Sequence, residues 1–262
     1  KQTSEIAVTM DKLSLPRGQM ETDYQKMLRS LYITLQQQIN ELENGQVEQA
    51  EYFTMWVHQI KTPIAALRLL LAEEEDERSQ EMREELFSIE QYVEMALQFS
   101  RLSAKSTDFV IGEVSLDKIV REAIHKYARL FVRKKIKLEL TSIDTQILTD
   151  EKWLEFVIEQ ILSNAIKYTA GGTISVYLKE EPEQETKELV IEDTGIGIAP
   201  EDLPRIFEKG YTGYNGHADK RSTGIGLYLC RKIMRKLSHE ITIESEIGVG
   251  TKVHLEMRSR DK

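Results

Sequence analysis

The sequence predicts an α+β protein built from a helical hairpin followed by a two-layer α/β sandwich. The N-terminal part carries apolar residues at helical spacing. After residue 115 the pattern changes to helices that alternate with short strand-like runs. A length of 262 residues suits one large domain or two ordinary ones. Because the two patterns differ, we expect two folded parts joined by a linker.

The first regular feature is a narrow apolar seam that starts at Tyr24, beyond residues 1–20, which lack clear periodicity. Its steps of three and four residues predict a two-stranded coil, although a single surface helix would show the same short pattern. Asn44-Gly45 is the place where this helix would be interrupted. The seam consists of Tyr24, Leu28, Leu31, Leu35, Ile39 and Leu42.

Two further helical stretches, at about 46–72 and 80–102, predict an antiparallel hairpin. The acidic run 73–77 between them is typical of a solvated turn. A lone hairpin cannot bury both apolar stripes, so we expect a homodimer in which two hairpins form a four-helix bundle. The expected inward residues are Phe53, Val57, Ile60, Ile64, Leu67 and Leu71, with Met82, Leu86, Ile89, Val93 and Ala96 opposite them.

Beyond a linker at 103–115, helices and strands alternate, which predicts a mostly antiparallel sheet covered by helices. Asp150 is the expected N-cap of a helix that runs through Tyr168. The other expected helices are 116–133 and about 224–237. The expected strands are 135–140, 173–179, 188–192, 241–246 and 251–257, with a turn at 247–250 joining the last two.

Composition excludes some classes of protein. The net charge of −9, from 35 basic and 44 acidic residues, does not match the basic footprint of a nucleic-acid binder. A single cysteine, Cys230, excludes an internal disulfide framework. No apolar run approaches the ~18 residues that a membrane helix needs. Since the chain starts at Lys1 rather than Met, we expect a fragment whose membrane segment would lie upstream.

The first chemical motif is WVHQIKTP, which places His58 beside the apolar stripe of its helix. Thr62 follows one turn later on the same face, and Pro63 bends the helix because its ring opposes the carbonyl of Gln59. A neutral imidazole is nucleophilic near pH 7. Taken alone, however, this motif is explained as well by an ordinary surface histidine.

The second motif is EQILSNAIKYT, in which Gln160, Asn164 and Lys167 share one helical stripe and Tyr168 follows. Amide oxygens suit Mg²⁺, a lysine suits phosphate, and a tyrosine ring can cover a base. A polar helix face is the simpler interpretation of these residues when the motif is taken alone.

Two glycine motifs complete the set. Asp193 ends an apolar strand before Gly195 and Gly197, where a carboxylate can accept from an adenine amino group and glycines allow close approach. Gly224 and Gly226 open a helix whose backbone N–H groups can bind phosphate. The polar segment between them, FEKGYTGYNGHADKRS, suits a lid over a nucleotide or an unrelated surface loop. A Walker A loop is absent from the sequence. The Gly195-x-Gly197 motif lacks the third glycine that a dinucleotide-binding turn would have.

The order of the four motifs is more specific than any one of them, and with it the sequence resembles the histidine kinases of two-component systems. WVHQIKTP resembles the H box, EQILSNAIKYT the N box, and DTGIGI the first G box. RIFEKGYTG resembles the F box and TGIGL the second G box, so the likeness covers about residues 52–257. It implies ATP and Mg²⁺ as cofactors and an ATP-binding domain of the gyrase/Hsp90 type. It divides the chain into a juxtamembrane segment and signalling helix at 1–50, a phosphotransfer hairpin at 51–104, a linker at 105–115 and the ATP-binding domain at 116–262.

The resemblance also assigns roles to residues. His58 is the expected phosphoacceptor, with Gln59 and Thr62 beside it in the catalytic set, and Asn164 and Gln160 are the expected Mg²⁺ ligands. The expected nucleotide-binding residues are Asn164, Lys167, Tyr168, Asp193, Gly195, Gly197, Lys209, Tyr211, Thr223, Gly224, Gly226, Leu227 and Thr251.

WVHQIKTPIAALRLLL, YVEMALQFSRL, TDEKWLEFVIEQILSNAIKYT and KGYTGYNG are similar to the intramembrane-sensing kinases of Gram-positive bacteria. Those kinases act with ABC-type transporters in resistance to antimicrobial peptides such as bacitracin. The resemblance implies a cell-membrane protein with this part on the cytoplasmic side, a response-regulator partner and an ABC-type transporter partner.

Three residues depart from the wider family pattern. Gln59 stands where a carboxylate is usual, Gln160 where Asn is common, and Ser222 where a glycine often occurs. An amide cannot act as a general base, so Gln59 would orient the imidazole and leave its proton to solvent. Two rivals to a kinase stay open: a nucleotide-binding scaffold that transfers no phosphate, and a plain ATPase of the gyrase/Hsp90 type.

Overall fold

The computed structural model describes Pro16 and residues 18–72, 76–103, 109–179, 186–213 and 223–258. The chain divides into two compact units, Lys1–Thr107 and Asp108–Lys262. The first contains only helices among its described residues, and the second combines helices with a sheet. The α+β fold class predicted from the sequence is confirmed.

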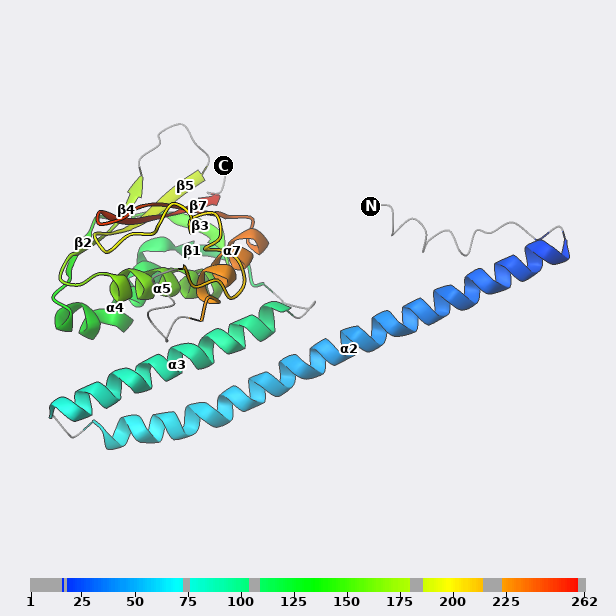
Figure 1. The fold of residues 1–262 in the computed structure, drawn as a ribbon, viewed down its shortest axis with the longest axis horizontal. Coiled ribbons are helices and arrows are strands. Elements are labelled where there is room, and N and C mark those ends of the chain that lie inside the picture. The colour runs from blue at the N-terminus through cyan, green and yellow to red at the C-terminus, as the bar shows by residue number, and fades with distance from the viewer. Residues whose placement is uncertain are drawn as a thin grey trace. The chain divides into compact units, whose positions relative to one another are not determined.

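The first unit is a helical hairpin of α2 (Gln19–Leu70) and α3 (Glu77–Ser103), as Figure 1 shows. The expected break at Asn44-Gly45 is wrong, because α2 continues through it for 52 residues. A glycine inside a helix costs only about 1 kcal/mol, and good helix formers on both sides offset that cost. The helix also continues through Pro63.

The core of the hairpin is small. It consists of Val57 and Ile64 from α2 with Leu86, Val93 and Leu97 from α3. Ion pairs flank it, one of them between Lys61 and Glu94 at 2.9 Å and another between Arg68 and Glu90.

Several residues expected to point inward stay exposed in the single chain: Leu67 at 49%, Met82 at 42% and Ile89 at 46%. The seam is exposed as well, for example at Leu31 and Leu42. An apolar face thus runs along both the hairpin and the N-terminal half of α2, and the described residues of the first unit leave it exposed.

The second unit is a two-layer sandwich, with the sheet on one side and helices on the other (Figure 1). The five-stranded sheet has the order β2-β4-β5-β7-β6, and all neighbours are antiparallel except β2 and β4. The strands are β2 (Lys137–Leu140), β4 (Thr173–Lys179), β5 (Thr186–Asp193), β6 (Glu240–Glu246) and β7 (Gly250–Arg258). The helices are α4 (Leu116–Arg133), α5 (Glu151–Tyr168) and α7 (Gly226–Lys236).

The core of this unit lies between the sheet and the helices, and alternation along the strands builds it. Ile174 and Val176 of β4 and Leu255 of β7 are fully buried, whereas their neighbours on the other face are polar. On that face His254 contacts Glu188 at 2.6 Å. The apolar sides of α4, α5 and α7 cover the inner face, and α5 is buried along most of its length.

Two short strands were not predicted. β1 (Gly112–Ser115) pairs antiparallel with β3 (Gln146–Thr149) in a separate two-stranded sheet. Residues 112–115 therefore form part of the second unit rather than the end of a linker. Four-residue strands carry too few alternations to stand out from a loop.

The helix boundaries of the second unit follow from their caps. Ser115 and Asp150 accept the backbone N–H groups of Lys118 and Trp153, as N-caps do. α4 and α7 are each followed, just after the C-cap, by a residue with positive φ: Lys135 at 54° and Ser238 at 60°. There the N–H groups of Ile136 and His239 bond back to carbonyls five residues earlier, the pattern of a Schellman motif.

Candidate nucleotide site

The centre of the candidate site is Asp193, the last residue of β5, which is 8% exposed. Its Oδ1 accepts the backbone N–H of Gly195 at 2.8 Å, and Thr251 lies opposite it in the β5–β7 register. Burial raises the pKa of Asp193 to about 6, against the lowering effect of the N–H groups of Gly195 and Thr251. The carboxylate is therefore ionised at neutral pH and held in place as a hydrogen-bond acceptor.

The two glycines after Asp193 are required by close contacts. A Cβ on Gly195 would lie 2.6 Å from the carbonyl oxygen of Tyr168 and 2.7 Å from Oδ1 of Asp193. Gly197 has φ +72°, and a Cβ there would lie 2.0 Å from the carbonyl oxygen of Glu246. The glycines thus keep the space beside the carboxylate open and let the turn pack against the β6–β7 hairpin.

The β6–β7 hairpin supports the glycine turn that follows Asp193. The sequence did not predict this support. Oγ of Ser245 accepts the N–H of Ile198 at 2.8 Å and donates to the carbonyl of Gly250 at 2.8 Å. The N–H of Gly248 bonds to the carbonyl of Ile196 at 2.9 Å. At Gly250 a Cβ would lie 1.9 Å from the carbonyl oxygen of Asp193. The turn at 247–250 was expected as a hairpin connection, but nothing in its spacing showed which loop it would support.

The C-terminal half of α5 supplies the amide and lysine side chains. Gln160 is 6% exposed, whereas Asn164, Lys167 and Tyr168 are partly exposed. Nζ of Lys167 lies 5.2 Å from the ring centroid of Tyr168. The N–H of Ile196 bonds to the carbonyl of Tyr168 at 3.3 Å. The second and third sequence motifs therefore meet at the end of α5.

The two ends of the predicted lid also meet. The N–H of Gly210 bonds to the carbonyl of Gly224 at 2.9 Å, and Gly224 has φ +64° with no room for a Cβ beside Gly210 and Tyr211. The hydroxyl of Tyr211 donates to Asp202, and the Arg205 guanidinium stacks over the Tyr211 ring. Ser222 and most of the predicted lid lie outside the described residues.

Beyond the lid, α7 starts at Gly226, followed by Leu227. Its described first turn has no acidic residue, and Ile225 at the N-cap makes no side-chain capping bond. Such an end leaves backbone N–H groups for an anion. Thr223, just before this helix, and Lys209, near the start of the lid segment, are exposed.

The expected phosphoacceptor lies in the other unit. His58, Gln59 and Thr62 are exposed on α2, next to Val57, which is 1% exposed and part of the hairpin core. Oγ1 of Thr62 donates to the carbonyl of His58 at 3.3 Å. The first motif therefore presents a histidine to solvent from a packed helix, and the other three motifs come together in the second unit.

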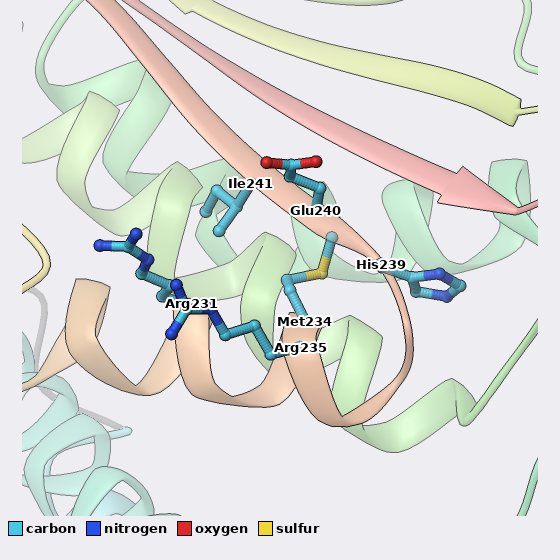
Figure 2. Close-up of a pocket in the computed structure, with 6 residues that line it drawn as sticks. All are labelled: Arg231, Met234, Arg235, His239, Glu240 and Ile241. Atoms are coloured by element: carbon cyan, nitrogen blue, oxygen red, sulfur yellow. The ribbon is translucent and has the colours of Figure 1, made fainter.

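A pocket of about 260 Å³ lies at the opposite end of α7. Figure 2 shows Arg231, Met234 and Arg235 from α7 with Glu240 and Ile241 from β6, and His239 on the connection between them. None of these residues belongs to the four motifs. Nε2 of His239 contacts the hydroxyl of Thr149 at 3.0 Å, which ties this connection to β3.

Among the residues that the structure describes, no helix combines the length and apolar character needed to cross a membrane.

The family model described as histidine kinase-, DNA gyrase B- and HSP90-like ATPase matches residues 149–261. Sensor histidine kinase YxdK of Bacillus subtilis is 36% identical over 231 residues, which cover 88% of this chain and 71% of YxdK. Sensor protein BceS of the same organism is 34% identical over 75% of this chain and 58% of BceS. Sensor protein kinase GraS of Staphylococcus aureus is 35% identical over 77% of this chain and 58% of GraS.

Solved structures show the same fold. Full-length ShkA in complex with AMPPNP has a TM-score of 0.59 and 20% identity, covering 82% of this chain and 47% of ShkA. The Acinetobacter baumannii histidine kinase AdeS has a TM-score of 0.53 and 20% identity, covering 78% of this chain and 98% of that structure. From these matches and the site geometry, the chain belongs to the sensor histidine kinases and carries the ATPase domain that they share with DNA gyrase B and HSP90.

Proposed function

We propose that this chain uses ATP to phosphorylate His58 and then passes the phosphoryl group to an aspartate on a response regulator. The observation that carries the proposal is the pairing of two features. The second unit holds a buried carboxylate between glycines at a strand end, and the first unit presents an exposed histidine on a packed hairpin.

The second unit would hold ATP through groups that suit each part of the nucleotide. Asp193 would accept from the adenine amino group, in the space that Gly195 keeps open. Tyr168 would flank the base and Lys167 would contact a phosphate. The uncapped start of α7 would donate backbone N–H groups to the phosphates. The residues around it would be Thr223, Gly224, Gly226 and Leu227, with Lys209 and Tyr211 from the first part of the lid.

Asn164 and Gln160 would hold Mg²⁺ through their amide oxygens, one turn apart on α5. The residues fit this ion, because a buried amide such as that of Gln160 requires a polar partner and its oxygen is a ligand that suits Mg²⁺. Phosphate oxygens and water would complete the ligand set. When bound, Mg²⁺ offsets the negative charge of the transferring phosphoryl group.

At His58 the chemistry would be an in-line displacement. A neutral ring nitrogen forms a bond to the γ-phosphorus while the bond from that phosphorus to the β–γ bridging oxygen breaks, and ADP leaves. The proton of the imidazole passes to solvent, since the amide of Gln59 cannot accept it. Thr62, one turn away, would orient a water molecule when the phosphorylated regulator is hydrolysed.

The exposed apolar face supports a homodimer. Two hairpins would bury Leu67, Met82 and Ile89 in a four-helix bundle, and residues 1–50 would carry the signal into it through the exposed seam. Residues 51–104 would then form the phosphotransfer hairpin, and 116–262 together with β1 would form the ATP-binding domain. The shorter linker that remains before β1 would allow the two to meet.

The motif resemblance to the intramembrane-sensing kinases suggests a role in the response to antimicrobial peptides or cell-envelope stress, and the similarity to the sensor proteins YxdK, BceS and GraS agrees with a sensor role. We propose on the same resemblance a membrane-bound full-length protein, with this part on the cytoplasmic side and an ABC-type transporter as partner.

The test is incubation with Mg²⁺ and ATP labelled on the γ-phosphate, with His58→Ala as the control. We expect an acid-labile, base-stable label on the parent chain and none on the variant. A parent chain that binds ATP without being labelled would favour the nucleotide-binding scaffold. Label on neither chain with continuous release of phosphate would favour the plain ATPase.

A further inference from the structure

Three lysines of α4 and its C-cap form a ladder against α5. Lys118 contacts Glu151 at 2.8 Å and Lys126 contacts Glu159 at 2.6 Å, both as ion pairs. The third, Lys134, contacts the backbone: its Nζ donates to the carbonyls of Ile166 at 2.7 Å and Lys167 at 3.1 Å. The ladder therefore ends on the last turn of α5.

That last turn is the part of α5 that carries the nucleotide residues. The last four carbonyls of a helix lack partners within it. Here Ala165 accepts from Thr169, and Tyr168 accepts from Ile196 of the glycine turn. The two carbonyls between them, at Ile166 and Lys167, are the ones that Lys134 satisfies.

We propose that Lys134 is a positioning residue for the nucleotide site, acting by holding the last turn of α5 in its binding conformation. This inference rests on the proposed function, because it assumes that Lys167 and Tyr168 contact ATP. The ammonium group satisfies two carbonyls and places positive charge at the negative end of the helix. Both effects keep the last turn helical before ATP arrives.

The position of Lys134 is itself fixed by the end of α4. The N–H of Lys134 bonds to Leu130, and the N–H of Ile136 bonds to Phe131, so the chain turns sharply at Lys135. Ile136 is 7% exposed and anchors the start of β2. Lys134 is thus held where its side chain reaches α5.

Without Lys134, the last turn would fray, and ATP binding would have to order it. Ordering that backbone costs conformational entropy, so we expect ATP to bind about tenfold more weakly. The contacts of Lys167 and Tyr168 are regained once ATP is bound, so the rate at saturating ATP should stay within about twofold of the parent.

The test compares Lys134→Met, Lys134→Arg and Lys118→Met in the full 262-residue chain. Lys118→Met is the matched control, since it removes the same charge from the same ladder. The ion pairs of Lys118 are with Glu151 at the start of α5 and with Glu122 of α4, away from the last turn of α5. The measurements are the Kd for Mg–ATP by calorimetry, the KM for ATP in autophosphorylation, and the melting temperature without ATP.

We expect Lys134→Met to raise the Kd and KM by about tenfold, Lys134→Arg to restore both, and Lys118→Met to change neither. Equal weakening in Lys134→Met and Lys118→Met would overturn the proposal in favour of a general charge effect. A lower melting temperature with unchanged Kd at a temperature where the variant is folded would reduce Lys134 to a stabilising cap. The Kd does not depend on His58, so a parent chain that binds ATP without labelling itself defeats only the proposed function. A parent chain that binds no ATP defeats both.

Discussion

Replacing Asp193 by Asn should make the second unit more stable and bind ATP more weakly. The carboxylate is 8% exposed, and burial raises its pKa from 3.8 to about 6. At about 1.4 kcal/mol per pKa unit, ionising this group in the folded protein costs roughly 3 kcal/mol relative to the unfolded chain. An amide avoids that cost.

The gain is smaller than this difference, because Asn has one acceptor oxygen for the N–H groups of Gly195 and Thr251. Weakening one of those bonds costs about 1 kcal/mol, which leaves a net stabilisation of roughly 1–2 kcal/mol at neutral pH. For a domain of this size that corresponds to an increase in melting temperature of about 2–8 °C. Loss of the charged acceptor should weaken ATP binding by about tenfold or more.

The pH dependence provides the control. The folded-state pKa lies above the unfolded value, so the folded protein binds this proton more tightly, and the parent loses stability as the pH rises from about 4 to 6. The Asp193→Asn variant lacks this titrating group, so its advantage over the parent should be largest at pH 8 and vanish near pH 4. Thermal melts of both proteins at these two pH values measure it. A variant less stable than the parent at pH 8, or an advantage that did not change with pH, would refute the reasoning.

Two further substitutions and one thiol-labelling reaction test other parts of the structure. Lys135→Gly should raise stability by about 0.5–1 kcal/mol, since φ 54° strains any residue with a Cβ, and chemical denaturation should show a higher midpoint with the same slope. Ser245→Ala should weaken ATP binding by about fivefold, because the glycine turn loses its brace to Gly250; calorimetry giving the parental Kd would contradict this. Cys230 is fully buried and its thiol pKa is raised to about 12, so iodoacetamide should not modify the native chain but should modify it in denaturant; fast reaction of the native chain would place the thiol at the surface.

Local signals accounted for much of the fold. α4 has the predicted limits, 116–133, because a strong apolar stripe begins at a serine cap. α5 begins after Asp150 as expected, since that side chain accepts from Trp153. The break at Asn44-Gly45 was wrong because a local turn signal was overridden by the helix around it. β1 and β3 were missed because their pairing joins segments about 35 residues apart, which no local pattern reveals.

The sequence predicted which residues of the candidate site would lie close together, but not which other residues would hold them in place. Motif order placed Asp193, Gly195 and Tyr168 in one site, and the structure brings them together through the Ile196–Tyr168 bond. Ser245 and Lys134 were not foreseen, because each acts through hydrogen bonds between elements distant in sequence. A serine in a strand and a lysine at a helix end are both common on protein surfaces, so composition alone gives no sign of these roles.

The central claim is that ATP held by the second unit phosphorylates His58 in the first. Phosphorus NMR of the 262-residue chain after incubation with Mg–ATP tests it most directly, with His58→Ala and Asp193→Asn measured alongside. The account predicts a phosphohistidine signal in the parent, none in His58→Ala, and a signal in Asp193→Asn that appears more slowly at limiting ATP. A phosphohistidine signal that persisted in His58→Ala, or its absence from a parent chain that binds ATP, would contradict the account.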